Sequence, residues 1–268
     1  MNAYATMTDL LTRVSDADAT SGLNALIAAS REIDEFCGRH FYTERATKYF
    51  GADRCGDVWV DDVLDIESVT EIDDDLEYTD AWSAGDWWLS PANGWPKTRL
   101  VASPNAMRTA PTGDRSLRIV GTFGYGDGLS ASPWQALGVT VTASSDSATS
   151  LTASASGAVV AGMTLLIESE QVFVSAVSGT TLTARRGVNG TTAAAHTAKA
   201  ASKALYPLPV VDAAMWLAEL TIQSVGRMGL TGEKIGEYEW RAQAASMLKT
   251  RADLCDIVLR RYSRNLGV

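Results

Sequence analysis

Hydrophobic residues recur every three or four positions in two segments near the ends of the chain. This spacing places them on one face of an α-helix. The first stripe consists of Leu23, Leu26, Ile27, Ile33, Phe36 and Cys37. The second stripe consists of Val211, Ala214, Met215, Ala218, Ile222 and Val225. The pattern therefore predicts two amphipathic helices, and a core-facing surface is the simplest role for each stripe.

Capping and stop residues predict where these helices begin and end. Thr20 or Ser21 can cap the first helix, and Gly38 can end it. Pro209 suits the first turn of the second helix, and glycines follow its last hydrophobic position. Two further helices are predicted, over Thr8–Val14 and Ala242–Arg261. A glycine-containing loop over residues 229–238 is expected before the last of them.

Residues 41–126 show the alternation and the turn residues that are typical of β-strands. The candidate strands are Thr47–Phe50, Val58–Val60, Ser68–Ile72, Trp87–Leu89, Arg99–Val101 and Leu117–Phe123. Five of the eight tryptophans lie here, namely Trp59, Trp82, Trp87, Trp88 and Trp95. Because aromatic residues on strands usually pack against the sheet, packing anchors are the favoured interpretation, and a sugar-binding platform is the alternative.

A different composition interrupts the chain between residues 134 and 204. This segment is rich in Ser, Thr, Ala and Gly, and its only charged residues are Asp146, Glu168, Glu170, Arg185, Arg186, Lys199 and Lys203. Its alternating hydrophobic runs predict about five short strands that close into a small barrel or sandwich. Compact folds tolerate insertions at loop tips, so we expect residues 1–133 and 205–268 to form one interrupted domain.

The charge and the cysteines of the chain exclude several classes of protein. The net charge is −9 at pH 7, whereas a protein that neutralises nucleic-acid phosphates needs a basic surface. Cys37, Cys55 and Cys255 are an odd, widely spaced set that implies no disulfide framework. The N-terminus lacks the features of a signal peptide, and no apolar run is long enough for a membrane span. We therefore expect a soluble protein made in a cytoplasm.

Few residues suggest catalysis or metal binding. Cys37, His40 and Cys55 are one ligand short of a structural zinc site. His196 lies in a loop of small residues without a nucleophile elbow. The glycines at and after Gly121 lack the spacing of a phosphate-binding loop. We therefore expect no catalytic residues, no cofactor and no metal.

Acidic residues are in excess from Asp53 to Asp86, where thirteen carboxylates accompany a single base, Arg54. One interpretation is a solvated surface whose charges repel one another. The other is a surface that DNA passes without sticking, because carboxylates repel phosphates at short range.

Six segments follow one another in an order that points to a known family. They are Leu23–Phe41 with its ending Cys-Gly-Arg-His-Phe, Ile66–Ile72 with the pattern Ile-x-Ser-Val-Thr-x-Ile, Val120–Gly126, the helix led by Pro207, the loop Lys234–Tyr238 and Arg260–Tyr262. Together they resemble the head–tail connector (adaptor) proteins of tailed bacteriophages. The resemblance covers residues 1–133 and 205–268, and parts of residues 134–204 are similar to a small β module of phage structural proteins.

The resemblance implies an α+β fold, in which a helical adaptor domain (a helical hub plus a β-strand region) is interrupted by a small all-β barrel or sandwich. It implies a structural protein of the virion neck, made in the cytoplasm of the bacterial host, with no enzymatic activity. Copies of the chain, usually twelve, would form a ring beneath the portal protein. The ring would extend the DNA channel and carry the stopper, the tail terminator or other neck proteins.

The resemblance also suggests contact residues. Members of the family commonly dock on the portal through their C-terminal segment, by charge-assisted bonds to carboxylates. The candidate portal contacts are Arg260, Arg261, Tyr262 and Arg264. An ordinary basic helix end is the alternative interpretation of these residues. The candidate acidic surface of the DNA channel consists of Asp61, Asp62, Asp73, Asp74 and Asp75.

Two other functions compete with the adaptor. A tail completion or baseplate-type component would contact the tail tube instead of the portal. A carbohydrate-binding or hydrolytic module would use the tryptophans, with a carboxylate pair such as Asp61 and Glu67 for acid–base work on a glycoside.

Overall fold

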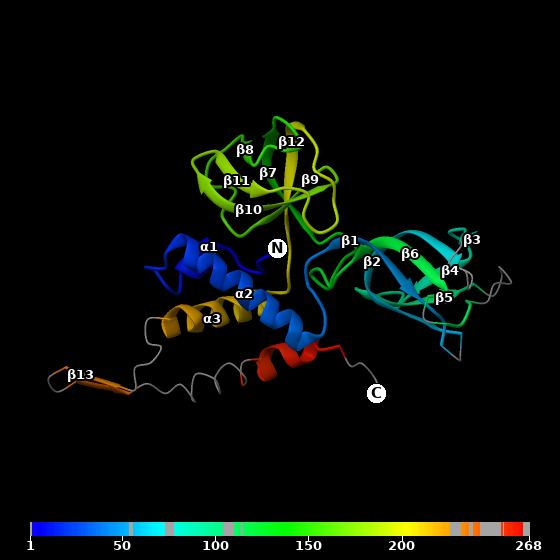
Figure 1. Ribbon diagram of the computed structural model, residues 1–268, viewed down its shortest axis with the longest axis horizontal. Coiled ribbons are helices and arrows are strands. Elements are labelled where there is room, and N and C mark those ends of the chain that lie inside the picture. Colours follow the sequence, from blue (N-terminus) through cyan, green and yellow to red (C-terminus); the bar gives the residue numbers. More distant parts are fainter. Residues whose placement is uncertain are drawn as a thin grey trace.

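The computed structural model consists of a helical layer, an open sheet and a closed barrel (Figure 1). The structure describes residues 2–53, 56–72, 78–103, 110–113, 115–225, 232–235, 238–241, 253 and 255–264. In Figure 1 the barrel lies above the helices, and the open sheet lies to one side of both.

The helical layer consists of α1 (Met7–Leu11), α2 (Ala19–Cys37) and α3 (Leu208–Val225). The cap of α2 is Asp18, whose side chain accepts a hydrogen bond from the N–H of Ser21, so the predicted caps lie inside the helix. Gly38 ends α2 as predicted, with a φ of 61° in the left-handed region that glycine adopts freely. The stripes of α2 and α3 pack into one core, whereas Phe36 remains 37% exposed.

The open sheet consists of β1 (Glu44–Phe50), β2 (Val58–Ile72), β3 (Tyr78–Trp82), β4 (Trp87–Ser90), β5 (Lys97–Ala102) and β6 (Leu117–Phe123). Its strands are antiparallel in the order β1-β6-β2-β5-β4, with β3 beside β2. The segments predicted as two strands, Val58–Val60 and Ser68–Ile72, form one strand. They were separated in the prediction because β2 pairs first with β5 and then with β6, with irregular register between.

The barrel consists of β7 (Trp134–Ala143), β8 (Ser150–Ala153), β9 (Thr164–Ile167), β10 (Glu170–Ser178), β11 (Thr181–Arg185) and β12 (His196–Ala204). The strands close in the order β10-β11-β8-β7-β12-β9, and closure removes the open edges that a sandwich would leave. The hydrophobic runs predicted β7, β9, β10 and β11. The prediction missed β12, because its Ala, Lys and Ser side chains carry little hydrophobic alternation.

The predicted α+β fold with a helical adaptor domain is wrong. Strands predominate in the described residues, and both the open sheet and the barrel have a hydrophobic core of their own. Helical periodicity identified α2 and α3 correctly, but it does not measure how much of a chain is helical. The strands of residues 44–123 form an independent sheet instead of decorating a helical hub.

Beyond α3, the chain differs from its prediction wherever the structure describes it. A hairpin of β13 (Gly232–Ile235) and β14 (Tyr238–Arg241) takes the place of the expected loop. Much of the predicted helix Ala242–Arg261 lies outside the described residues. Its described end is a π-helical turn at Cys255–Leu259, followed by a 3-10 turn at Arg260–Tyr262. Among the described residues, no helix has the length and hydropathy needed to cross a membrane.

Candidate functional site

The C-terminal segment is bound where the end of α2 meets the open sheet. The backbone N–H of Arg264 donates to the carbonyl oxygen of Cys37 at 2.9 Å. Its Nη2 donates to the carbonyl oxygen of Val60 at 2.7 Å, and its Nη1 pairs with Oδ1 of Asp61. One arginine therefore joins the C-terminal segment to a helix and to a strand. We call these contacts the C-terminal clip.

Aromatic packing holds the same segment in place. The ring of Tyr262 lies 5.7 Å from that of Phe41 and 5.5 Å from that of Tyr125, measured between centroids. Both contacts are edge-to-face, an arrangement that aromatic pairs prefer. Of the four candidate portal contacts, Arg260 and Arg261 are exposed, whereas Tyr262 and Arg264 are engaged within the chain.

Two of the candidate channel carboxylates belong to this junction. Asp61 pairs with Arg264 and, at 3.2 Å, with Nζ of Lys48. Although partial burial opposes the effect, these two cations hold the pKa of Asp61 below its ordinary value. Asp62 is 4% exposed and lies 3.5 Å from Nε of Arg39; burial raises its pKa, and Arg39 opposes the rise.

Asp62 is therefore buried at this junction and does not face solvent in the chain as described. The physical reason is that β2 carries Asp62 beneath the loop after α2, where Arg39 covers it. Asp61 is half-buried and paired with Arg264, which was itself a candidate portal contact. The other three candidates, Asp73, Asp74 and Asp75, lie outside the described residues.

A small polar cavity of about 100 Å³ lies inside this junction. Its lining residues are Gly38, Arg39, His40, Lys48, Asp61, Asp62, Gly124 and Arg264. The lining brings three permanent cations close to two carboxylates, and Glu44 adds a third carboxylate at 3.2 Å from Nε2 of His40. The charges are thus nearly balanced, and the cluster stabilises the contact between helix and sheet.

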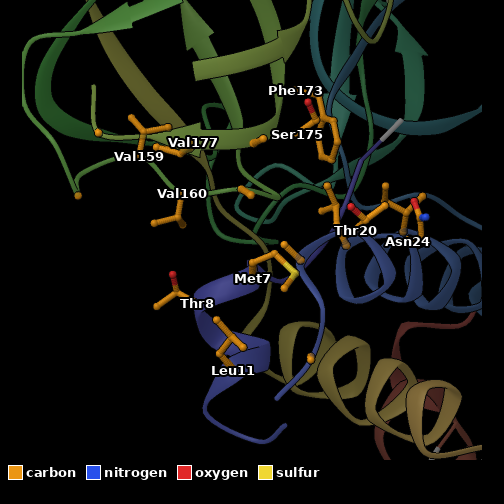
Figure 2. Close-up of a pocket in the computed structure, with 18 of the residues that line it drawn as sticks. Met7, Thr8, Leu11, Thr20, Asn24, Val159, Val160, Phe173, Ser175 and Val177 are labelled. Carbon is orange, nitrogen blue, oxygen red and sulfur yellow. The ribbon is translucent and has the colours of Figure 1, made fainter. Parts of the chain in front are cut away.

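An apolar groove separates the helices from the barrel (Figure 2). Its volume is about 760 Å³, within the range of ligand pockets. Figure 2 shows Val159, Val160 and Val177 of the barrel on one side, with Met7 and Leu11 of α1 on the other. The groove is an apolar surface that the described residues leave open.

A network of amides fixes the barrel to the rest of the chain. The Nδ2 of Asn189 donates to Asn2 at 3.0 Å and to Gln171 at 2.7 Å, and Asn2 donates back at 2.8 Å. Nε2 of Gln171 in turn donates to Oγ1 of Thr43 at 3.2 Å. The N–H of Arg45 on β1 donates to the carbonyl oxygen of Asn189 at 2.9 Å. The barrel is therefore held against the N-terminal segment and the start of the open sheet.

The only charged cluster buried in the described part of the barrel has a structural role. Nε and Nη2 of Arg186 donate to Glu170 at 2.6 Å, Nη1 donates to the carbonyl oxygen of Ser145, and Nη2 also donates to that of Ala194. His196 is 2% exposed and lies between Glu168 at 2.9 Å and Glu170 at 2.8 Å. Burial of the carboxyl group favours a higher pKa, but Arg186 lowers the pKa of Glu170 to about 2. All the nitrogens of Arg186 are engaged, so the cluster ties barrel loops together.

The residues considered for metal binding are not brought together. Sγ of Cys37 lies 3.8 Å from the carbonyl oxygen of Leu259, and burial raises the pKa of its thiol to about 12. His40 stacks on Tyr42 and pairs with Glu44. Cys55 lies outside the described residues. Within the ranges given above, no group of three or more His, Cys, Asp or Glu side chains could hold a metal ion.

The carboxylate pair considered for glycoside chemistry is engaged elsewhere. Asp61 is held by Arg264 and Lys48, while Glu67 forms a two-pronged pair with Arg45 at 2.6 and 2.7 Å. Each carboxylate is thus neutralised by a different arginine, which is typical of structural ion pairs.

A scan against models of known protein families finds no match to this chain, and a search of curated proteins also finds no match.

Proposed function

We propose that this chain is a structural protein of a tailed-phage virion, a head–tail connector made in the bacterial cytoplasm. Many copies, usually twelve in such rings, assemble beneath the portal protein. The ring extends the DNA channel without binding DNA sequence-specifically and carries the stopper or other neck proteins. The ordered motifs of the sequence support this proposal. No helical adaptor domain is part of it, because the fold is mainly β.

Exposed hydrophobic side chains on the helical layer carry the proposal. They are Leu11 at 40%, Phe36 at 37%, Leu208 at 78% and Trp216 at 42% of full exposure. They belong to three helices, and Leu11 also lines the apolar groove. Exposed hydrophobic side chains that lie together mark surfaces that bind other proteins. Repeated head-to-tail contacts around a closed ring would bury them on every copy.

Of the four candidate portal contacts, the C-terminal clip leaves Arg260 and Arg261 available to bind the portal. Arg264 is paired with Asp61, so it is not free to bind a partner while the clip is closed. Arg260 and Arg261 lie on the adjacent 3-10 turn with exposed side chains. Two neighbouring guanidinium groups suit carboxylates of a partner, since arginine binds them with paired hydrogen bonds. The portal contact is therefore proposed on these two residues.

Two measurements test the proposal. The purified chain should form closed rings, seen by light scattering and electron microscopy. Trp216→Asp should abolish the rings by placing a charge in the interface, whereas Leu129→Asp should not. Leu129 is 82% exposed in a loop outside the helical layer, so it controls for the added charge alone. Rings that survive Trp216→Asp would contradict the proposed interface.

The position of this chain in the virion is tested with purified virus particles. Mass spectrometry should find this chain in near-equal copy number with the portal protein, and it should stay with the heads after the tails are sheared off. A large excess over the portal, or loss together with the tails, would instead favour a tail completion or baseplate-type component. Absence from particles would reject a virion role.

A further inference from the structure

Two exposed tryptophans lie on the outer face of the open sheet. In an antiparallel pair, residues directly opposite each other point to the same face. On β5, Arg99 lies opposite Trp59 of β2, and Val101 lies opposite Trp88 of β4. Residues 99 and 101 are two positions apart and share a face, so both tryptophans do as well. Leu100 between them points into the core.

The exposure of these rings is large. Trp59 is 58% exposed and Trp88 is 46% exposed, whereas Trp82 of the same sheet is 6% exposed. The expectation that the tryptophans of this region are packing anchors therefore holds for Trp82 and fails for the other two. Strand spacing of about 4.8 Å and a rise of about 3.4 Å per residue place the Cα atoms of Trp59 and Trp88 about 12 Å apart.

The surroundings of Trp59 orient its ring before any ligand arrives. Its indole Nε1 donates to Oδ2 of Asp53 at 3.1 Å. The guanidinium carbon of Arg99 lies 5.7 Å from the ring centroid, and Nη1 of Arg99 pairs with Asp57 at 2.9 Å. A ring that is already held loses little conformational entropy on binding.

The chemistry of this face selects among ligands. Arg99 and Asp57 neutralise each other, and the carboxylate of Asp53, bonded to the indole of Trp59, leaves no excess of positive charge beside the exposed ring. They supply hydrogen-bond donors and acceptors, while the indole faces supply flat apolar surfaces. Aromatic platforms also stack nucleic-acid bases, but those sites follow the backbone with positive charge. The acid excess from Asp53 to Asp86 opposes any polyphosphate.

We propose that this outer face binds an extended, uncharged oligosaccharide. Its sugar rings stack on Trp59 and Trp88, and its hydroxyl groups bond to Arg99 and Asp57 between them. The separation of the two tryptophans requires a chain of sugars, since a single ring does not reach both. The site binds without hydrolysing, and it is independent of the connector role, which rests on the helical layer.

Calorimetric titration of the full chain with cellohexaose, chitohexaose and mannohexaose tests this site. At least one of the three should bind. Trp59→Ala and Trp88→Ala should each weaken that binding at least about tenfold, the factor that corresponds to ~1.4 kcal/mol. Leu129→Ala is the control, because Leu129 is also exposed, at 82%, but lies in a loop outside the open sheet. Its affinity per chain should equal that of the unmodified protein.

Three results would overturn the proposal. They are the absence of binding to all three oligosaccharides, unchanged affinity of both sheet variants, and equal weakening by Leu129→Ala. Ring assembly of the sheet variants, followed in parallel, shows whether this face instead contacts a protein. Loss of rings without any oligosaccharide binding would make it a protein interface and reject the sugar site. The connector proposal is judged separately, by the variants of the helical layer.

Discussion

The environment of Asp34 differs from that of an ordinary surface carboxylate. It lies near the end of α2, accepts a hydrogen bond from the hydroxyl of Tyr4 and pairs with Nη1 of Arg31 at 3.1 Å. Burial raises the pKa of Asp34 to about 6, and the charge of Arg31 and the Tyr4 hydrogen bond only partly offset it. The unfolded chain has the ordinary value of 3.8.

This shift predicts how stability depends on pH. Between pH 4 and 6 the folded chain binds more protons at Asp34 than the unfolded chain, so the contribution of Asp34 is present at low pH and lost as pH rises. A rise from 3.8 to about 6 corresponds to ~3 kcal/mol. Asp34→Asn keeps a hydrogen-bond acceptor but cannot titrate. In urea unfolding, the free energy of unfolding of Asp34→Asn relative to the unmodified protein should therefore rise by about 2 kcal/mol from pH 4 to pH 7. A constant difference would contradict the burial of this charge.

Other residues show what composition leaves undecided. The acid excess was visible in the sequence, but the partners of its members were not. Asp61 pairs with an arginine 203 positions later in the chain. Asp62, its neighbour, is covered by Arg39. No local signal distinguishes such carboxylates from those that face solvent, because the covering groups come from distant segments.

At the scale of elements, the loop between β11 and β12 positions the barrel. Gly190 in this loop has a φ of 76°, and a Cβ atom there would lie 2.0 Å from the carbonyl oxygen of Arg45 on β1. The pair Asn189-Gly190 is typical of a turn, but nothing local in the sequence indicates a docking contact. Close approach of two backbones requires glycine at this position.

We expect Gly190→Ala to destabilise the chain more than Gly179→Ala does. Gly179 has a similar φ of 61° in the β10–β11 turn, but a Cβ there meets no atom within 4 Å. Both substitutions carry the cost of a left-handed backbone, so their difference measures the contact with Arg45. It should be about 1–3 kcal/mol, the usual cost of overpacking, in thermal or urea unfolding. Equal effects would mean that the loop does not dock on β1.

The elements themselves were predicted unevenly. Strong helical stripes identified α2 and α3, because a buried face leaves a repeat that a few turns make visible. Alternation identified β6 with both its bounds, Leu117 and Phe123. β12 escaped because its Ala, Lys and Ser side chains carry little hydrophobic alternation. Predicted caps failed at Thr20 and Ser21, since Asp18 two residues earlier makes the same hydrogen bond.

At the scale of the whole molecule, the C-terminal clip joins parts that no short segment connects. Arg264→Ala removes the bonds of its guanidinium to Asp61 and Val60, while Lys48 still pairs with Asp61. Charged hydrogen bonds are each worth about 1.5–3 kcal/mol, and one partner remains, so we expect a loss of ~2 kcal/mol. Hydrogen exchange should become faster in residues 255–264.

Arg260→Ala is the control for this change, because Arg260 lies in the same segment with an exposed side chain. Its exchange and its stability should match the unmodified protein within about 0.5 kcal/mol. If residues 255–264 exchange as slowly in Arg264→Ala as in the unmodified protein, the aromatic packing of Tyr262 holds the segment without the clip.

The sequence by itself determined the positions of α2, α3 and the strongly patterned strands such as β6, because their periodicities depend on neighbours two to four positions apart. It did not determine that the inserted strands close into a barrel, or that the sheet has a core of its own. Nor did it show that Trp59 and Trp88 face outward or that Arg264 pairs with Asp61. Tertiary structure decided these points, because strand partners, burial and ion pairs depend on segments that lie far apart in the chain.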